Sequence, residues 1–160
     1  MVSFIHLLLM IIVANGSPII IRNLLRNKWN YAVDADMVFI NGQPLFGTSK
    51  TWRGIIASLC ITAIVGIILG YSIQTGIMIS SLAMAGDMSS SFIKRRLKRA
   101  PSSMAPLLDQ VPESFLPALV MMQSFGLNLF SVFMLIAVFI IFELSISKIL
   151  YRLGLRKHPY

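Results

Sequence analysis

The sequence predicts an all-α, polytopic membrane bundle of about five transmembrane helices, with the N-terminus outside and the C-terminus inside the cell. Hydrophobic residues make up 56% of the 160 residues and charged residues only 12%, and the mean hydropathy is +0.78. This balance is far from that of a soluble domain. Because a bilayer core of about 30 Å needs roughly 20 apolar residues per helix, we expect one membrane-embedded domain over residues 1–160.

Apolar runs mark the expected helices, with boundaries that sequence places only to within a few residues. The runs cover 2–25, 54–73, 76–93, 113–124 and 127–150. No Lys or Arg precedes Arg22, so the first run lacks the basic stretch of a cleavable signal peptide and is interpreted as a retained helix. The fourth run is short for a span. The alternative is a four-span protein in which 113–150 forms one long or re-entrant helix.

The basic residues predict the orientation in the membrane. All 14 Lys and Arg lie within 22–53, 94–99 or 148–157, and five spans place these segments on one side. The positive-inside rule makes that side the cytoplasm, as expected for a multi-pass protein of the cell membrane. Four spans would split the basic residues across the bilayer. The net charge of +8 therefore reflects topology, and we expect no nucleic-acid partner.

Asp87 lies inside the third apolar run, about seven residues or roughly 10 Å from its basic end. An acid at this depth costs about 2.5–3.5 kcal/mol on insertion scales, so it should face a polar cavity. Ser80, Ser91 and Lys94 share a helical face with Asp87. The competing interpretation is a packing seam of small residues with one buried, hydrogen-bonded acid.

The first run is expected to be interrupted at Asn15-Gly16-Ser17-Pro18. Proline removes a backbone donor and frees carbonyls that lipid cannot satisfy, so this break should face protein or water. The side-chain amide of Asn15 could bind a ligand in the same cavity. An ordinary proline kink is the alternative.

Lys50-Thr51-Trp52-Arg53 stands where the second helix begins. Thr51 is a candidate N-cap, and a helix N-terminus beside Lys and Arg is suited to bind phosphate. Alternatively, Trp52 is an interfacial anchor and the two cations only follow the positive-inside rule.

The remaining titratable residues limit the metal chemistry. Asp109 follows a cluster of cations and is either a helix cap, an ion-pair partner or a ligand. Asp34 and Asp36 are interpreted as solvated charges, and Glu143 as an ion-pair partner of Lys148 or of a neighbour. Cys60 is the only cysteine, and the two histidines lie near opposite ends of the chain, which excludes a His/Cys metal site. Carboxylate oxygens completed by phosphates favour Mg²⁺ beside a phosphate substrate.

Three segments of the chain resemble the archaeal CDP-archaeol synthases, a family related to the CDP-diacylglycerol synthases. These are ANGSP at 14–18, FGTSKTWRG at 46–54, and GDMSSSFIKRR at 86–96 followed by LDQ at 108–110. Their order and spacing fit the family over nearly the whole chain. The chain departs from the family at Ser90, where the family tends to have glycine, and at 41–44, where it often has Asp-Gly-Arg-Arg.

The resemblance implies a Mg²⁺-dependent cytidylyltransferase that joins CTP to a lipid phosphate, giving a CDP-activated lipid, of the CDP-archaeol or CDP-diacylglycerol kind, and pyrophosphate. By position, Asp87 and Asp109 would be catalytic and bind Mg²⁺, and Lys94 would also be catalytic. The other implied binding residues are Asn15, Lys50, Arg53, Ser91, Arg95, Arg96 and Gln110. The implied partners are CTP, a lipid phosphate and the bilayer, and a homodimer is left open.

Two functions of other classes remain at this stage. A non-catalytic transporter or binding protein for an anionic solute or lipid would also use a broken helix and an intramembrane acid. A scaffold that binds acidic lipids would explain the basic loops, but it would leave Asp87 without a role.

Overall fold

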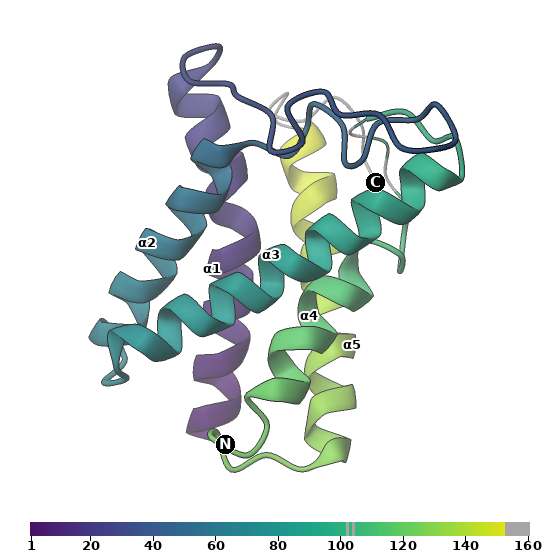
Figure 1. Cartoon of the computed structure of the whole chain (residues 1–160). Helices are drawn as coiled ribbons and strands as arrows, with labels where there is room; N and C mark the ends of the chain where they lie inside the picture. Colours follow the sequence, from purple (N-terminus) through teal and green to yellow (C-terminus); the bar gives the residue numbers. More distant parts are fainter. Residues whose placement is uncertain (102, 104, 153–160) are drawn as a thin grey trace.

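The computed structural model describes residues 1–101, 103 and 105–152. Over these residues the chain forms five α-helices and, apart from two isolated bridges, no β-structure, which confirms the all-α prediction. Successive helices run in alternating directions, and α3 crosses the bundle at a steep tilt (Figure 1). The helices are α1 (Val2–Leu25), α2 (Trp52–Ile68), α3 (Ile73–Arg96), α4 (Gln110–Val120) and α5 (Leu129–Arg152).

The helices differ in how well they match a bilayer. In the described part of the chain, two helical segments, Val2–Leu25 and Leu129–Ile149, are long and apolar enough to cross a membrane. Helix α2 is apolar but has only 17 residues. Helix α4 has 11 residues, or about 16 Å at 1.5 Å per residue. The membrane character is thus supported, while the number of spans remains a prediction.

One form of the four-span alternative, the single long helix, is wrong. Residues 113–150 do not form a single uninterrupted helix, because α4 ends at Val120 and α5 begins at Leu129. Pro112 falls in the first turn of α4, where the missing N–H has no helical partner to lose. The helix therefore begins at Gln110, three residues before the predicted start.

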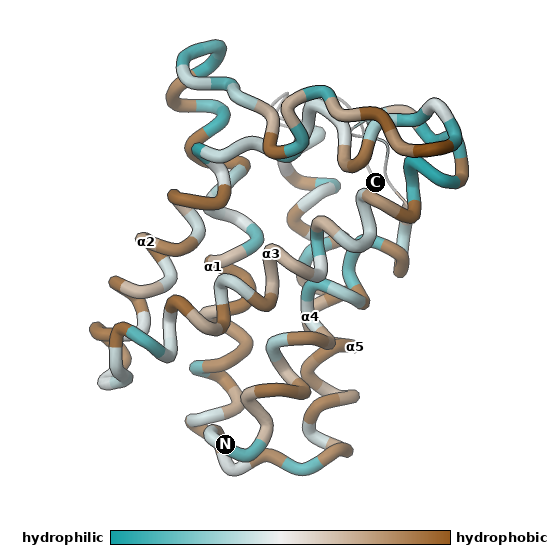
Figure 2. Tube along the Cα trace, in the orientation of Figure 1, coloured by the Kyte–Doolittle hydropathy of each residue, from teal (hydrophilic) through white to brown (hydrophobic). Residues whose placement is uncertain are grey.

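The ends of the helices separate by charge. The C-terminal ends of α1, α3 and α5 and the N-terminal end of α2 meet at one end of the bundle, and Met1 lies at the other (Figure 1). The described Lys and Arg residues lie at or near the first of these ends, which we call the basic end, and Figure 2 shows the hydrophilic loops that gather there. Arg156 and Lys157 lie outside the described residues. This arrangement is the one that five alternating segments require.

Helix α1 is not interrupted, contrary to the prediction. It continues through Pro18 to Leu25. Since Pro18 has no N–H, the carbonyl of Ala14 one turn earlier has no helical donor, and the hydroxyl of Ser58 in α2 donates to it at 2.7 Å. The expectation that the freed carbonyl faces protein is correct, and the hydrogen bond explains why the helix survives the proline.

Packing differs between the two halves of the bundle. Leu7, Met10 and Ile11 of α1 pack with Leu135 and Phe139 of α5 in a fully apolar core in the half near the N-terminus. The half at the basic end holds a polar cavity instead. Figure 2 shows the corresponding change from brown to mixed colours along the bundle.

Glycines allow the helices that line the cavity to approach closely. A Cβ on Gly86 of α3 would overlap the backbone of Pro112 and Glu113 at the start of α4, and a Cβ on Gly76 would lie 2.6 Å from the Cα of Ala63 in α2. Two helices can come this close only where one of them has no side chain. Gly86 therefore fixes how α4 sits against the part of α3 that carries Asp87.

Candidate active site

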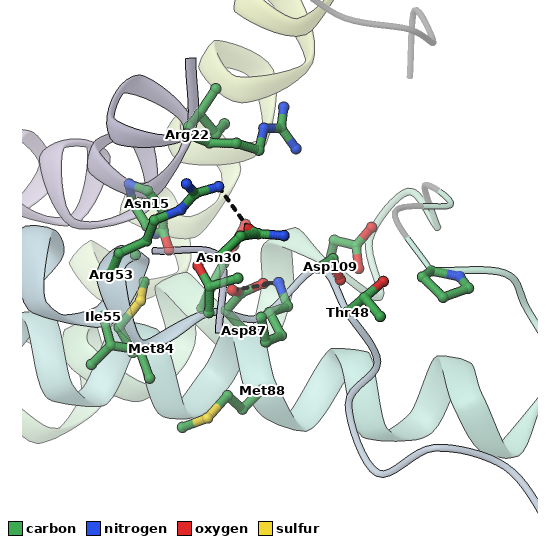
Figure 3. A pocket seen from close by; sticks show the side chains of 18 of the residues that line it. Asn15, Arg22, Asn30, Thr48, Arg53, Ile55, Met84, Asp87, Met88 and Asp109 are labelled. Carbon is green, nitrogen blue, oxygen red and sulfur yellow. Dashed lines mark hydrogen bonds and ion pairs between the residues drawn. The ribbon is translucent and has the colours of Figure 1, made fainter. Parts of the chain in front are cut away.

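A cavity of about 860 Å³ opens at the basic end and is lined by residues of every helix and of the connecting loops (Figure 3). This volume lies in the range of small-molecule sites. Its lining mixes charges of both signs with amides. The cations are Arg22, Arg26, Lys50, Arg53 and Lys94, the acids are Asp87, Asp109, Glu113 and Glu143, and the amides are Asn15, Asn23, Asn27 and Asn30.

The first acid of the cavity is held by a lysine from another element. Helix α3 presents Asp87 to the cavity, and Lys50, two residues before α2, approaches both carboxylate oxygens at 2.5 Å. Both side chains line the cavity. The prediction that Asp87 faces a polar cavity is confirmed. The packing-seam alternative is correct for its neighbour Gly86, which lies against the backbone of α4.

A second lysine holds the second acid. Lys94, near the end of α3, lies 2.6 Å from Oδ1 of Asp109 and donates to the carbonyl of Ser103 at 3.1 Å. The other carboxylate oxygen of Asp109 accepts from the N–H of Ala105 at 2.9 Å. The pair therefore ties the loop after α3 to the start of α4, and of the three predicted roles the ion pair is confirmed for Asp109.

Arg53 lines the cavity, but its guanidinium group forms hydrogen bonds with the loop that follows α1. Its Nη1 donates to the carbonyls of Arg26 and Lys28, just after α1, and its Nη2 donates to Oδ1 of Asn30 at 2.7 Å. These carbonyls belong to the chain that leaves α1, where helical partners are missing. Arg53 thus joins the C-terminal end of α1 to the N-terminal end of α2.

Asn15 is the residue of α1 that was predicted to bind a ligand. Its Nδ2 donates to the carbonyl of Ile11 at 3.1 Å, whereas its Oδ1 is buried without a hydrogen-bond partner. Asn15 lines the cavity. A buried acceptor without a partner is costly unless a ligand or water donates to it, so this oxygen is available to a ligand.

Four residues implied by the resemblance lie outside the lining of the cavity. Ser91 is buried in α3. Arg95 is also buried and donates to the carbonyl of Ala100 at 2.8 Å. Arg96 donates to the carbonyl of Gln43, and Gln110 accepts from the N–H of Leu107 at 2.7 Å. Instead of facing the cavity, three of them hold the loops that surround it.

Asp34 is not a solvated charge, contrary to the prediction. Only 1% of this residue is exposed, and its Oδ2 accepts from the N–H groups of Phe46 and Gly47 at 2.9 and 2.7 Å. Burial alone would raise the pKa of Asp34, but these backbone donors outweigh it and hold the pKa below its ordinary value. The carboxylate fixes the turn that leads into Thr48, Ser49 and Lys50. Asp36 is exposed, as predicted.

The sequence analysis did not identify Glu113, and it interpreted Glu143 as an ion-pair partner rather than as a residue of the cavity. Glu113 is buried in the first turn of α4, where the charges of Asp87, Glu143 and Lys50 act on it. Glu143 projects from α5 into the cavity. The signal that singled out Asp87, an acid in an apolar run, also applies to Glu143. Asn30 and Thr48 also line the cavity, and nothing in their local sequence marks them.

The acids of the cavity suit a hard cation only with help from a ligand. In the part of the chain that the structure describes, no three His, Cys, Asp or Glu side chains converge on a point that could hold a metal ion. Four carboxylates nevertheless line one cavity together with five cations. Mg²⁺ is usually held by one or two carboxylates plus substrate phosphates and water. The donor set therefore fits Mg²⁺ that arrives with a polyphosphate.

Comparison with known proteins gives consistent matches. A family model described as CarS-like CDP-archaeol synthase matches residues 1–160. The CDP-archaeol synthase of Sulfurisphaera tokodaii is 30% identical over 155 residues, covering 93% of this chain and 90% of that protein. The CDP-archaeol synthase of Pyrobaculum aerophilum is 31% identical over 159 residues, covering 92% of each.

Coverage differs among the relatives. The CDP-archaeol synthase of Thermofilum pendens is 36% identical over 104 residues, but the match covers 62% of this chain and 51% of that protein. The chain thus spans about half the length of that relative. A solved structure of "an intramembrane enzyme for archaeal membrane lipids biosynthesis" superposes with a TM-score of 0.76 at 28% identity, covering 89% of this chain and 91% of that one.

Proposed function

The chain belongs to the CDP-archaeol synthase family, and from this premise we propose that it transfers CMP from CTP to a lipid phosphate of the archaeol type. The prediction of family membership is confirmed. The observation that carries the proposal is the cavity itself. It opens at the basic end, and two of its four acids form ion pairs with lysines. The bundle around it contains two helices, α1 and α5, that are long and apolar enough to cross a membrane.

The proposed orientation follows from charge. Five spans, with the N-terminus outside and the end of α5 in the cytoplasm, would put the basic end on the cytoplasmic side. CTP would then enter from water, while the lipid phosphate would arrive from the adjoining leaflet. The cavity is the place where both could meet.

The chemistry needs little acid or base catalysis. The second ionisation of a phosphate monoester lies near pH 6, so at neutral pH the lipid phosphate is already a nucleophile. One of its oxygens would attack the α-phosphorus of CTP, and the bond from that phosphorus to the β-phosphate oxygen would break and release pyrophosphate. What remains for the protein is to position the phosphates and to offset their charge.

The residues of the cavity divide these tasks. Lys50 and Lys94 would contact phosphate oxygens, and the unpartnered Oδ1 of Asn15 would accept a hydrogen bond from the nucleotide. Asp87 and Asp109 would hold Mg²⁺, which would supply positive charge to offset that of the phosphates. Arg53, Arg95, Arg96 and Gln110 would position the surrounding loops through the hydrogen bonds described above.

The transporter hypothesis loses its main argument. It relied on a broken helix at 15–18, as in many secondary transporters, but α1 runs without interruption from Val2 to Leu25. No other feature of the described residues favours transport over transfer.

A nucleotide comparison tests the proposal. Purified protein in detergent would be given a lipid phosphate, Mg²⁺ and either CTP, dCTP or ATP, and pyrophosphate would be measured. We expect release with CTP or dCTP, little with ATP, and none when the lipid phosphate is omitted. Equal use of ATP, or release without lipid, would contradict it.

A further inference from the structure

Residues 37–45 form a hairpin in the long loop between α1 and α2. Val38 pairs with Pro44 in an antiparallel bridge. The N–H of Phe39 donates to the carbonyl of Gln43 at 2.8 Å, and that of Leu45 donates to the carbonyl of Met37 at 3.1 Å. Gly42 has a φ of +74°, a conformation that suits glycine at a tight turn. The hairpin is therefore a defined element rather than a loose linker.

One strand of this hairpin presents an unbroken apolar surface. The exposed fractions are 55% for Met37, 63% for Val38, 39% for Phe39 and 96% for Ile40. Figure 2 shows this as a brown stretch in the loop beside the end of α3. Four consecutive exposed apolar residues are unfavourable in water and are a common mark of an interaction surface.

The hairpin is fastened to the C-terminal end of α3. The guanidinium of Arg96 lies over the rings of Phe39 and Phe92, 4.6 and 4.7 Å from their centroids, and it donates to the carbonyls of Gln43 and Pro44. Phe39 also meets Phe92 edge to face. These contacts fix the apolar strand at the level where α3 ends.

Two further features at that level are typical of a membrane–water boundary. Exposed aromatic residues gather at the same end of the bundle, at Trp29, Tyr31 and Trp52, as in the aromatic belts of membrane proteins. Below the hairpin, an apolar groove of about 420 Å³ runs along the outer side of α3. It is lined by Phe46, Ala85, Met88, Ser89, Phe92 and Ile93.

We infer that the hairpin is an interfacial anchor, with Val38 and Ile40 inserted at the boundary of headgroups and acyl chains beside α3. The apolar strand continues the apolar outer side of α3, so the leaflet that surrounds α3 is the occupant that covers it. An element that lies in the interface plane is held there because its apolar side chains are buried about 5–10 Å into the boundary between headgroups and acyl chains. The inference rests on membrane embedding and not on the proposed reaction.

The anchor has a direct connection to the cavity. Asp34 holds the turn at Phe46 and Gly47 just after the hairpin, and Lys50 follows three residues later. A hairpin fixed in the interface therefore sets the height of the cavity rim relative to the lipid headgroups.

Spin labelling can test the anchor, because Cys60 is the only cysteine. Single cysteines would be introduced by Val38→Cys and by Ile40→Cys in a Cys60→Ala background, labelled with a nitroxide, and reconstituted in vesicles of phosphatidylcholine and phosphatidylglycerol. Accessibility to oxygen, which concentrates in lipid, would be compared with accessibility to a water-soluble nickel chelate. Ile64→Cys on the outside of α2 serves as the lipid control, and Lys28→Cys as the water control.

We expect labels at 38 and 40 to behave like the label at 64, with high access to oxygen and access to the nickel chelate reduced several-fold relative to position 28. Two results would overturn the inference. Access to the nickel chelate equal to that at position 28 would place the hairpin in water. Low access to both reagents would place it in a protein contact, such as a second copy of the chain. Neither result would bear on nucleotide transfer.

Discussion

The cavity contains two lysine–aspartate pairs that consist of the same residue types but differ in their surroundings. In the pair of Lys50 and Asp87 the side chains are 19% and 22% exposed, whereas in the pair of Lys94 and Asp109 they are 8% and 13% exposed. Asp109 also accepts from a backbone N–H, and Lys94 also donates to a carbonyl. Within residues 1–101, 103 and 105–152, the carboxylate of Asp87 accepts hydrogen bonds from Lys50 alone.

The difference separates a pair that only faces the cavity from a pair that also holds the surrounding loop. Lys50 can leave Asp87 for a phosphate without disturbing a loop, because neither side chain is bonded to the backbone nearby. Lys94 and Asp109 cannot separate without loosening the segment that ends α3 and begins α4. We therefore expect Asp87 to affect mainly turnover, and Asp109 to affect both turnover and stability.

The largest effect on activity is expected from Asp87→Asn. The substitution keeps the shape of the side chain but removes the charge that would hold Mg²⁺, so turnover should fall by about a hundredfold or more. The melting temperature in detergent should change little, because the carboxylate is not tied to the backbone. Near-normal turnover across a Mg²⁺ titration would show that Asp87 serves only the packing of the helices.

Asp109→Asn should reduce turnover and should also lower the melting temperature of the protein. Removing one partner of a buried pair costs about 3 kcal/mol or more, because the remaining charge is left unpaired. Here that charge is Lys94. Thermal unfolding, followed by intrinsic fluorescence, would compare the melting temperature of Asp109→Asn with that of Asp87→Asn. If both variants were equally stable, the distinction between the two pairs would fail.

Gly86→Ala should displace α4 from α3 and disturb both pairs together. The added methyl group would meet the backbone of Pro112 and Glu113, which cannot give way as a flexible side chain can, and such overpacking costs typically about 1–3 kcal/mol. Gly16→Ala is the matched control, since nothing lies within 4 Å of a Cβ at that position. Equal melting temperatures for the two variants would contradict the close contact.

The smallest effect on turnover is expected at the turn before Lys50. Asp34→Ala removes two charge-assisted hydrogen bonds and should cost about 2 kcal/mol, while raising the KM for CTP more than it lowers kcat, because Lys50 is less well placed. Asp34→Asn keeps an oxygen that can accept both N–H groups and should recover much of the loss. No recovery in Asp34→Asn would assign the role to charge alone.

The sequence was most informative where lipid sets the pattern. The apolar run at 2–25 coincides with α1, and the basic residues mark one end of the bundle, because both follow from transfer of side chains between water and lipid. It was less informative where hydrogen bonds between distant residues determine the structure. The run of four polar or helix-breaking residues at 15–18 suggested a break, but the hydroxyl of Ser58, forty-four positions away in sequence, satisfies the carbonyl that Pro18 leaves free.

The site was predictable in part for the same reason. Asp87, Asp109, Lys50, Lys94 and Asn15 line the cavity as expected, since charged and amide groups in or beside apolar runs need a polar environment. The resemblance also pointed to Arg95 and Arg96, but helical geometry turns them away from the cavity and toward the loops. Burial of Asp34 depends on two N–H groups of a turn, which no local pattern reveals.

Labelled CTP provides the most direct test of the proposed reaction. The protein would be incubated with a lipid phosphate, Mg²⁺ and CTP carrying radioactive phosphorus at either the α or the γ position, and the lipid would then be extracted. We expect the α label to appear in the lipid and the γ label to stay in water as pyrophosphate. Transfer of the γ label to the lipid, or of neither label, would contradict it.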